Sequence, residues 1–282
     1  MDGFLFIDKP IGMTSHDVVA KIKRKFKFDK IGHTGTLDPF ASGLLILCIG
    51  KATKLAYLFS DLDKKYEGTL VFGNHYDTYD TTGKILKKDH PSLHEDDIKQ
   101  KMASFIGSYD QLPPMYSAIK IDGEKLYDIA RRGEEIDREK RLVHIYQFDM
   151  IHGLEQNACD FICHVSKGTY IRSLAVDLAA KLHTLGALSR LRRLQVGSYT
   201  VEQAKTIEEV TLDDLMSLDV FFEHTQSIVL NDYMIKLVKN GIYLDERQIK
   251  TTTPFVVKNN EGELIAYYIV NDVNQYRPVV IF

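Results

Sequence analysis

The loop within residues 32–50, GHTGTLDPFASGLLILCIG, carries a single acid, Asp38, directly before Pro39. Aspartate before proline is common in turns, so a purely structural role is one interpretation. The other interpretation is a positioned reactive group. A residue before proline is biased to an extended backbone, and Gly32 and Gly35 would let the loop approach a ligand closely. A lone carboxylate placed in this way suits nucleophilic attack or proton transfer at a sugar or a base.

A second set of residues could assist such a carboxylate. Arg172 and Lys167 are candidates to hold Asp38 ionised or to bind a phosphate. Tyr66 and Tyr170 are candidates to stack on a nucleobase, a contact that every base tolerates. For either tyrosine taken alone, ordinary packing is the more common role.

Other reaction classes find no support in the spacing of the residues. Residues 43–51 superficially resemble a P-loop, but six residues separate the two glycines and Ala52 stands where Ser or Thr should hold magnesium. Cys159, Cys163 and His164 come near each other, yet a strand would place His164 on the opposite face from both cysteines. We therefore expect chemistry on an anionic substrate, without a cofactor or a metal.

Hydrophobic periodicity predicts the elements that must position these groups. They are, in chain order, a strand at 4–7, a helix capped by Thr14 or Ser15, a buried strand at 44–49, a short helix at 52–62, a half-buried strand at 66–72, a helix at 93–105 capped by Ser92, a strand at 161–165, and a helix carrying Leu174, Leu178 and Leu182. Residues 107–142 are expected to be irregular, and a long charged loop of this kind is more often functional than idle.

The end of the chain differs from the rest because it is rich in short strands, expected at 254–257, 264–270 and 278–282. The predicted fold class is therefore α+β. A mixed, mainly antiparallel central sheet with peripheral helices would occupy residues 1–224, and a small β-rich domain residues 225–282.

Composition is typical of a soluble globular protein, with 282 residues, 44% hydrophobic and 27% charged. The apolar stretch near the N-terminus is too short for a signal peptide, and no run approaches the ~20 apolar residues of a membrane span. Three cysteines, an odd number, favour reduced thiols. We therefore expect a cytoplasmic protein.

The charges are unevenly distributed along a chain whose net charge is −3. Residues 1–60 carry nine Lys or Arg against five Asp or Glu, and residues 166–193 carry six against one. Residues 201–224 carry seven acids against one lysine. Two alternatives remain open from charge alone: a basic face that binds phosphates, or ordinary solvated helix faces.

Several motifs occur in one order along residues 8–194. The stretch from Gly32 to Leu45 reads G-H-T-G-T-L-D-P-x-A-x-G-L-L. The others are Asp8-Lys9-Pro10 with Gly12, Met13 and Ser15; Lys64-Lys65-Tyr66; Asp77-Thr78-Tyr79-Asp80; Pro113 to Lys120 with Gly123, Leu126, Tyr127, Ala130 and Arg131; Ser166 to Leu174; and Leu191 to Leu194. In this combination the chain resembles the TruB-type tRNA pseudouridine synthases. The tail is similar to that family's small PUA-like RNA-binding domain.

The resemblance implies a function, a fold and a partner. Uridine 55 in the T-loop of tRNA would become pseudouridine: the N-glycosidic bond breaks, the uracil turns within the pocket, and a C–C bond forms to the same sugar carbon. No cofactor would be needed, and the enzyme is expected to act as a monomer. The fold would be that of the pseudouridine synthases, with residues 107–142 as an insertion that grips the RNA.

The resemblance also implies roles for individual residues. Asp38 would be the essential carboxylate, Arg172 would pair with it, and Tyr66 would stack on the uracil. Tyr170 would help line the pocket. Two further residues would contact the RNA: His33, filling the space that the flipped nucleotide leaves, and Lys9, binding phosphate together with the basic helix at 21–27.

Two rival functions stay open at this point. One is an RNA-binding or tRNA-folding protein that keeps the architecture but has no catalytic activity. The other is hydrolysis of a nucleoside by a glycosidase, which would require paired carboxylates at the site.

Overall fold

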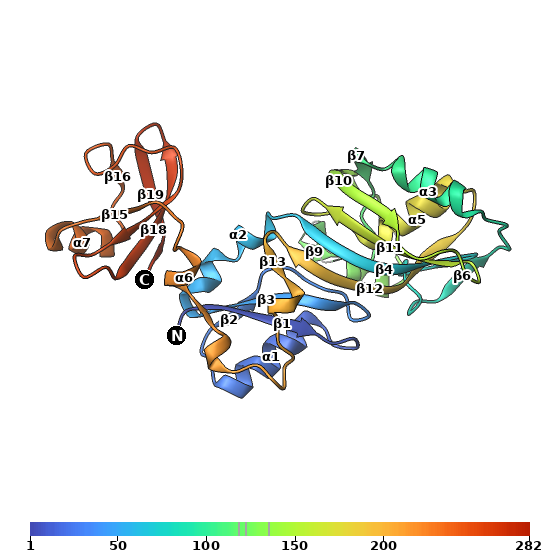
Figure 1. The fold of residues 1–282 in the computed structure, drawn as a ribbon, viewed down its shortest axis with the longest axis horizontal. Coiled ribbons are helices and arrows are strands. Elements are labelled where there is room, and N and C mark those ends of the chain that lie inside the picture. The colour runs from blue at the N-terminus through green and yellow to red at the C-terminus, as the bar shows by residue number, and fades with distance from the viewer. Residues whose placement is uncertain (118, 122, 135) are drawn as a thin grey trace.

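The computed structural model describes residues 1–117, 119–121, 123–134 and 136–282. A ten-stranded sheet runs in the order β14-β1-β3-β12-β4-β11-β10-β7, with β2 on β3 and β13 on β12. Its strands are β1 Gly3–Lys9, β2 Ile31–His33, β3 Ser42–Ile49, β4 Lys64–Phe72, β7 Gly107–Gln111, β10 Arg141–Met150, β11 Ala158–Val165, β12 Gly186–Val196, β13 Tyr199–Thr200 and β14 Met216–Ser217. Within the described residues its pairings are antiparallel except for β3 with β12 (Figure 1).

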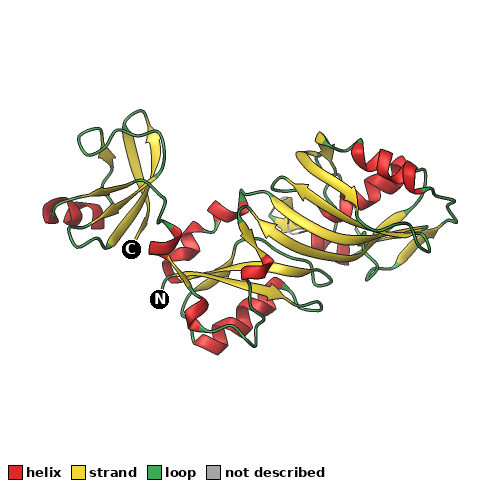
Figure 2. Ribbon diagram, viewed as in Figure 1, coloured by secondary structure: helices red, strands yellow, loops and turns green. Residues whose placement is uncertain are grey.

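Helices lie at the periphery of this sheet (Figure 2). They are α1 Ser15–Phe26, α2 Tyr57–Ser60, α3 Glu95–Ala103, α4 Leu126–Arg131, α5 Ile171–Lys181 and α6 Leu218–Phe221, with short 3₁₀ helices at Gly50–Leu55, Val201–Gln203 and Leu212–Asp214. Apolar side chains of α3 and α5 join those of β10, β11 and β4 in one buried core. The expected α+β fold, with a large mixed sheet, is confirmed.

α1 forms where the sequence predicts it, and Thr14 is its cap. The Thr14 side chain accepts a hydrogen bond from the backbone of Asp17, whose carboxylate returns to the Thr14 backbone, so the two residues form a capping box. Val18 and Ile22 face the core. At the other end Lys27 adopts a left-handed conformation, with φ 57°, and ends the helix.

β4 shows the expected alternation, with Tyr66, Gly68, Leu70 and Phe72 all buried. Gly68 is needed because a Cβ there would lie 2.5 Å from the Arg190 backbone oxygen on β12. The absence of a side chain at this position lets the Arg190 backbone of β12 and the Phe161 ring of β11 approach β4 closely.

A second sheet of five strands forms the end of the chain. The strand order is β15-β17-β18-β19-β16. The strands are β15 Ser227–Val229, β16 Leu244–Asp245, β17 Phe255–Lys258, β18 Leu264–Asp272 and β19 Gln275–Ile281, and the helix α7 Asp232–Lys239 follows β15. The sheet contacts the preceding part of the chain through an apolar cluster in which Phe222 stacks on Tyr267 at 4.9 Å between ring centroids. The strands expected in the tail are present.

Three local expectations are wrong. The helix expected at 52–62 is a 3₁₀ helix followed by α2, which ends where the Lys64 amine binds backbone carbonyls, among them that of Ser60 at 2.7 Å. Ser92 does not cap α3; His94 precedes the helix without a side-chain cap, and three acids in the first turn face the positive end of the helix dipole.

The third wrong expectation concerns residues 107–142, which are not irregular throughout. They begin with β7, end in β10, and contain a hairpin of β8 Lys120–Ile121 and β9 Glu124–Lys125 followed by α4. The local sequence of β7, GSYDQ, lacks apolar alternation because this strand lies at the edge of the sheet. Ala118, which is part of the Pro113–Lys120 motif, and Asp122 and Glu135 lie outside the described residues.

No described helix is both long enough and apolar enough to span a membrane.

Candidate active site

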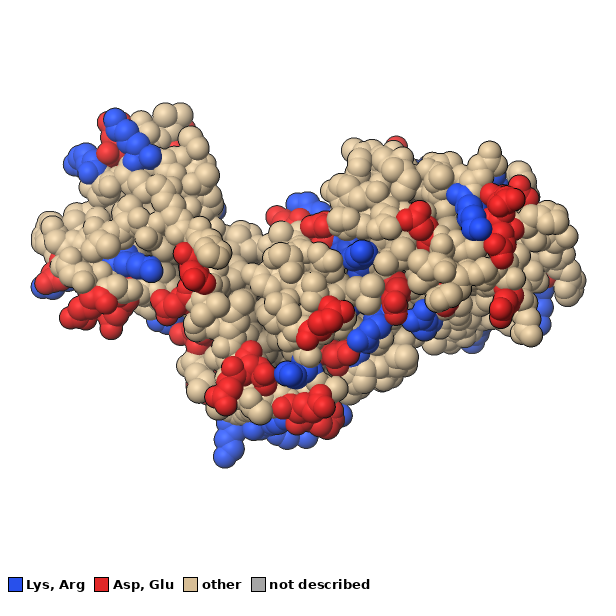
Figure 3. All heavy atoms as spheres, in the orientation of Figure 1, with Lys and Arg blue, Asp and Glu red and all other residues tan. Residues whose placement is uncertain are grey.

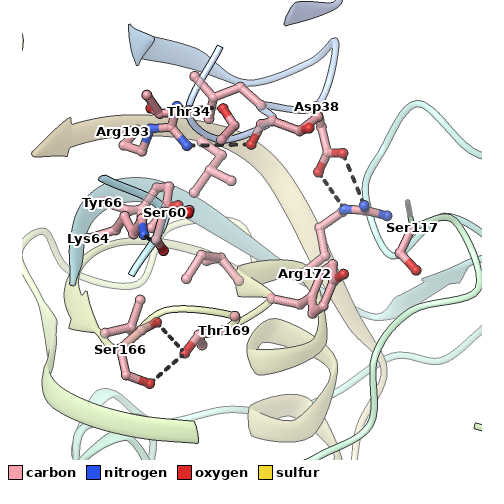
Figure 4. A pocket seen from close by; sticks show the side chains of 18 residues that line it. Thr34, Asp38, Ser60, Lys64, Tyr66, Ser117, Ser166, Thr169, Arg172 and Arg193 are labelled. Carbon is pink, nitrogen blue, oxygen red and sulfur yellow. Dashed lines mark hydrogen bonds and ion pairs between the residues drawn. The ribbon is translucent and has the colours of Figure 1, made fainter. Parts of the chain in front are cut away.

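A cavity of about 300 Å³ opens beside Asp38. It is lined by residues 34–38, by Lys64 and Tyr66 at the start of β4, by residues 168–172 before and within α5, and by Arg193 of β12 (Figure 4). Segments far apart in the sequence therefore meet beside the central strands β12 and β4. The volume is at the lower end of the range for small-ligand sites, which are typically ~300–1,000 Å³.

Arg172 and Asp38 form the ion pair that the resemblance implies. The guanidinium donates from Nε to Asp38 Oδ2 at 2.8 Å and from Nη2 to Oδ1 at 3.1 Å. It also donates to the backbone oxygens of Thr78 and Tyr116, each at 2.8 Å. The Arg172 side chain is 5% exposed and that of Asp38 is 34% exposed. The carboxylate is therefore held in a fixed orientation while part of it remains accessible from the cavity.

The Asp38 loop is held on one side by the turn after β1. The Leu37 backbone N–H donates to Ser15 Oγ at 2.9 Å, and the Gly12 N–H donates to the Pro39 oxygen at 2.7 Å. Gly12 has a φ of +86°, which other residues rarely adopt. The opening motif thus supports the residues that flank Asp38.

Arg193 holds the loop on its other side. It is buried, and its guanidinium donates to the backbone oxygens of Leu44 at 2.8 Å, Gly35 at 3.2 Å and Thr36 at 3.4 Å. Sequence reasoning noted Arg193 only as a basic residue within a motif. Gly43 lets β3 approach β12 closely at this point, because a Cβ there would lie 2.3 Å from the Arg193 backbone oxygen.

Both predicted stacking tyrosines line the cavity. Burial raises the pKa of the Tyr66 phenol, and the nearby Arg193 opposes that shift. Burial also raises the pKa of Tyr170, which immediately precedes α5. Each phenol is therefore neutral at physiological pH, as a stacking or hydrogen-bonding role requires.

The structure contradicts the expectation that Lys9 contacts a phosphate. Lys9 is fully buried, and its amine donates to the backbone oxygens of Pro10 at 2.8 Å and Met13 at 2.7 Å. Burial lowers the pKa of Lys9 to about 8, an effect that the Asp38 charge partly offsets. Lys9 stabilises the turn that supports the Asp38 loop, a role that the sequence pattern did not distinguish from phosphate binding.

His33 lies in β2, outside the set of residues that lines the cavity. Its ring meets the ring of His16 edge-on at 5.2 Å. Burial lowers the pKa of His33 to about 4, with smaller effects from His16 and Arg193, so the imidazole is neutral at physiological pH. Its Nδ1 is buried without a hydrogen-bond partner among the residues that the structure describes.

The remaining basic candidates are Lys167 and the cations of the basic helix. Lys167 does not pair with Asp38; its amine contacts Asp61 at 2.9 Å on the surface. In the basic helix, Lys25 binds the backbone oxygens of the acidic segment, including Ile207 at 2.8 Å and Glu208 at 2.7 Å. The other cations here, Lys21, Lys23 and Arg24 on α1 and Lys27 directly after it, are also exposed. In the face shown in Figure 3, basic side chains gather at the lower edge, where α1 lies in Figure 1.

Comparison with known proteins gives consistent matches. Residues 23–171 match the family described as TruB family pseudouridylate synthase, N terminal domain. "tRNA pseudouridine synthase B" of Onion yellows phytoplasma (strain OY-M) is 52% identical over the full length of both chains, and that of Acholeplasma laidlawii (strain PG-8A) is 49% identical over the full length of both.

Among solved structures, a chain of a Cbf5-Nop10-Gar1 complex aligns with a TM-score of 0.71 at 26% identity, covering 96% of this chain and 79% of that one. A chain of an H/ACA RNP bound to a substrate RNA containing 2'-deoxyuridine shares the fold, with a TM-score of 0.69 at 23% identity over 99% and 83% of the two chains. The family match covers more than half of the chain, and it includes Asp38. The chain therefore belongs to the TruB family of pseudouridylate synthases and is an isomerase.

Proposed function

We propose that this enzyme converts uridine 55 in the T-loop of tRNA to pseudouridine without a cofactor. Relatives that match over their full length bear the name tRNA pseudouridine synthase B, which supports tRNA as the substrate class. The observation that carries the proposal is the Asp38 carboxylate, fixed by two hydrogen bonds from a buried arginine beside a cavity of about 300 Å³.

Asp38 is the proposed catalytic carboxylate, and it starts cleavage of the N-glycosidic bond. Arg172 fixes the position of both carboxylate oxygens, so the reactive group is oriented before the substrate arrives. The detached uracil stays in the cavity and turns, its C5 bonds to the sugar carbon, and the C5 proton is lost. Tyr66 stacks on the base during this rotation, and Tyr170 also lines the cavity.

The target uridine has to leave the loop stack to reach Asp38, because the cavity lies inside the protein. Unstacking a base costs about a few kcal/mol, which new contacts must offset. We assign His33 to the space that the nucleotide leaves, since its neutral ring can pack against exposed bases. The exposed cations of α1 supply part of the attraction for the phosphates.

The proposed domain organisation follows from this function. Residues 1–224 form the catalytic domain, and the segment at about 107–142 is the insertion that grips RNA. Residues 225–282 form a small PUA-like RNA-binding domain. The described cavity is built from one chain, so we expect a monomer to be active, and tRNA as the substrate implies a cytoplasmic enzyme.

The proposal is tested by incubating the enzyme with an unmodified tRNA transcript and mapping pseudouridine chemically. We expect one modified position, nucleotide 55, and no modification of a transcript with cytidine at that position. Release of free uracil would indicate a glycosidase. Tight tRNA binding with no modified base would indicate a binding or folding protein, and either result would overturn the proposed reaction.

A further inference from the structure

Gln111 lies at the end of β7, next to the first turn of α5, and the proposed reaction assigns it no role. It is 1% exposed, although its side chain is polar. Its Oε1 accepts a hydrogen bond from the Tyr170 backbone N–H at 2.7 Å, and its Nε2 donates to the Tyr170 backbone oxygen at 3.1 Å. One side chain thus binds both backbone groups of the residue that precedes α5.

This clamp holds the residue at the start of a helix that has no side-chain cap. Tyr170 occupies the N-cap position of α5 and makes no side-chain cap hydrogen bond. The first N–H groups of a helix have no partner within the helix, so the start of an uncapped helix is prone to fray. By fixing the Tyr170 backbone, Gln111 fixes the point at which α5 begins.

The orientation of the Gln111 amide is determined by its partners. The Tyr170 N–H requires an acceptor and the Tyr170 carbonyl requires a donor, so the oxygen and nitrogen cannot exchange places. The second hydrogen of Nε2 points to the Tyr109 hydroxyl at 2.6 Å, and that hydroxyl lies 3.5 Å from Asp177 Oδ2 on α5. Gln111 is therefore itself held in place, from β7 and from the same helix.

Two further contacts join the segment after Gln111 to the first turn of α5. Ser173 Oγ donates to the Leu112 oxygen at 2.8 Å, and Arg172 Nη2 donates to the Tyr116 oxygen at 2.8 Å. Arg172 is the second residue of α5. Each of its four described side-chain hydrogen bonds joins a guanidinium nitrogen to a specific acceptor oxygen. A small rotation of this turn would therefore misalign the guanidinium against Asp38.

We propose that Gln111 is a positioning residue for catalysis: by clamping the Tyr170 backbone it sets the start of α5 and, through it, the place of Arg172 against Asp38. This inference rests on the proposed function. Misplacing a catalytic group by about 1 Å can cost about 100-fold in rate, so the contribution of a residue that never touches the substrate can be large.

The test uses Gln111→Met, which keeps the length of the side chain but removes its donor and its acceptor. At saturating tRNA and a temperature well below unfolding, we expect single-turnover pseudouridine formation to fall by about 10- to 100-fold, with tRNA affinity within about threefold of wild type. The matched control is Gln195→Met, because the Gln195 amide bonds the Gly197 oxygen in a turn outside the cavity lining. Its rate should match wild type.

The double variant Gln111→Met with Arg172→Lys distinguishes a positioning role for Gln111 from a purely structural role. If Gln111 acts through Arg172, Gln111→Met should slow the Arg172→Lys enzyme by no more than about twofold. Independent effects that multiply would overturn the inference, as would a Gln111→Met enzyme that is as fast per folded molecule as wild type. If Gln111→Met does not fold, Gln111→Glu, which keeps the acceptor for the Tyr170 N–H but loses both donors, should show the same slow rate.

Wild-type enzyme in the same assay distinguishes the two proposals. If the wild type forms no pseudouridine, the proposed function fails. If the wild type is active and the Gln111 variants are equally active, only the inference about Gln111 fails.

Discussion

Two groups of basic residues in this chain look alike in the sequence and differ in the structure. The outer cations, Lys21, Lys23 and Arg24 on α1 and Lys27 directly after it, are exposed. The inner cations, Lys9, Lys64, Arg172 and Arg193, lie beneath or beside the Asp38 cavity. Each of them donates hydrogen bonds to backbone oxygens. Only Arg172 among the inner cations pairs with a carboxylate in the described residues.

The difference shows that a basic residue in a nucleic-acid enzyme need not contact nucleic acid. A buried cation is costly unless its donors are satisfied, and backbone carbonyls satisfy them while fixing the local chain. Burial lowers the pKa of both Lys9 and Lys64 to about 8. The inner cations therefore build the site, whereas the outer cations are available to attract phosphates.

Among the basic residues, the largest effect is expected for Arg172→Met. Losing the two hydrogen bonds that orient Asp38 should lower the rate of pseudouridine formation by about 100-fold or more. tRNA affinity, measured by filter binding, should change by less than about threefold. Arg190→Met is the control, because Arg190 pairs with Glu67 at 2.9 Å outside the cavity lining and is 41% exposed. A large loss of affinity with an unchanged rate for Arg172→Met would show that Arg172 serves tRNA binding, as proposed for the outer cations, and not the orientation of Asp38.

Lys9→Met should reduce thermal stability and activity while leaving the salt dependence of tRNA binding unchanged. The reason is that the Lys9 amine binds Pro10 and Met13 rather than a phosphate. The measurement is the slope of log affinity against log salt concentration. A slope that falls by about one would show a phosphate contact and would contradict the structural role assigned to Lys9.

Lys23→Ala should have the opposite pattern: a shallower salt slope, by about one or less, weaker binding at low salt, and an unchanged rate at saturating tRNA. Lys23 is exposed on α1 and has no described side-chain hydrogen bond or ion pair. Lys88→Ala, on the exposed strand β6 Ile85–Lys88 and outside the segments proposed to bind RNA, tests whether the effect depends on position. Equal losses from both variants would indicate a nonspecific effect of net charge.

The smallest expected effect is on the pH dependence of stability. Lys9 and Lys64 should lose their protons near pH 8, which NMR of lysines labelled at the side-chain Cε carbon can follow. Because the folded pKa lies below the unfolded value, the unfolded chain binds more protons between about pH 8 and 10.5, so this contribution to stability rises with pH in that window. Lys9→Met should flatten part of that rise. Titration of both lysines above pH 10 would contradict their assignment to the inner group.

Much of the fold was accessible from the sequence because its signals are local. The Thr14 capping box, the alternation from Tyr66 to Phe72 and the apolar run of β3 each involve neighbouring residues. Residue type alone offered both Arg172 and Lys167 as partners for Asp38, and only the resemblance singled out Arg172, since 134 positions separate Asp38 from Arg172.

The roles of Lys9, Arg193 and Gln111 depend on which distant segments pack together. Gln111 bonds Tyr170 across 59 positions, and Arg193 reaches Gly35 across 158. No local pattern distinguishes a lysine that binds carbonyls from one that faces solvent. The edge strand β7 was missed for a related reason, because a polar edge strand carries no hydrophobic periodicity.

The most direct test of the central claim is the rate of pseudouridine formation by Asp38→Asn at saturating unmodified tRNA, together with its tRNA affinity. The account predicts no product above background and an affinity within about threefold of wild type, because Asn keeps the shape of the side chain without its charge. An Asp38→Asn enzyme that still forms pseudouridine at a rate near wild type would contradict the assignment of this carboxylate as the catalytic group.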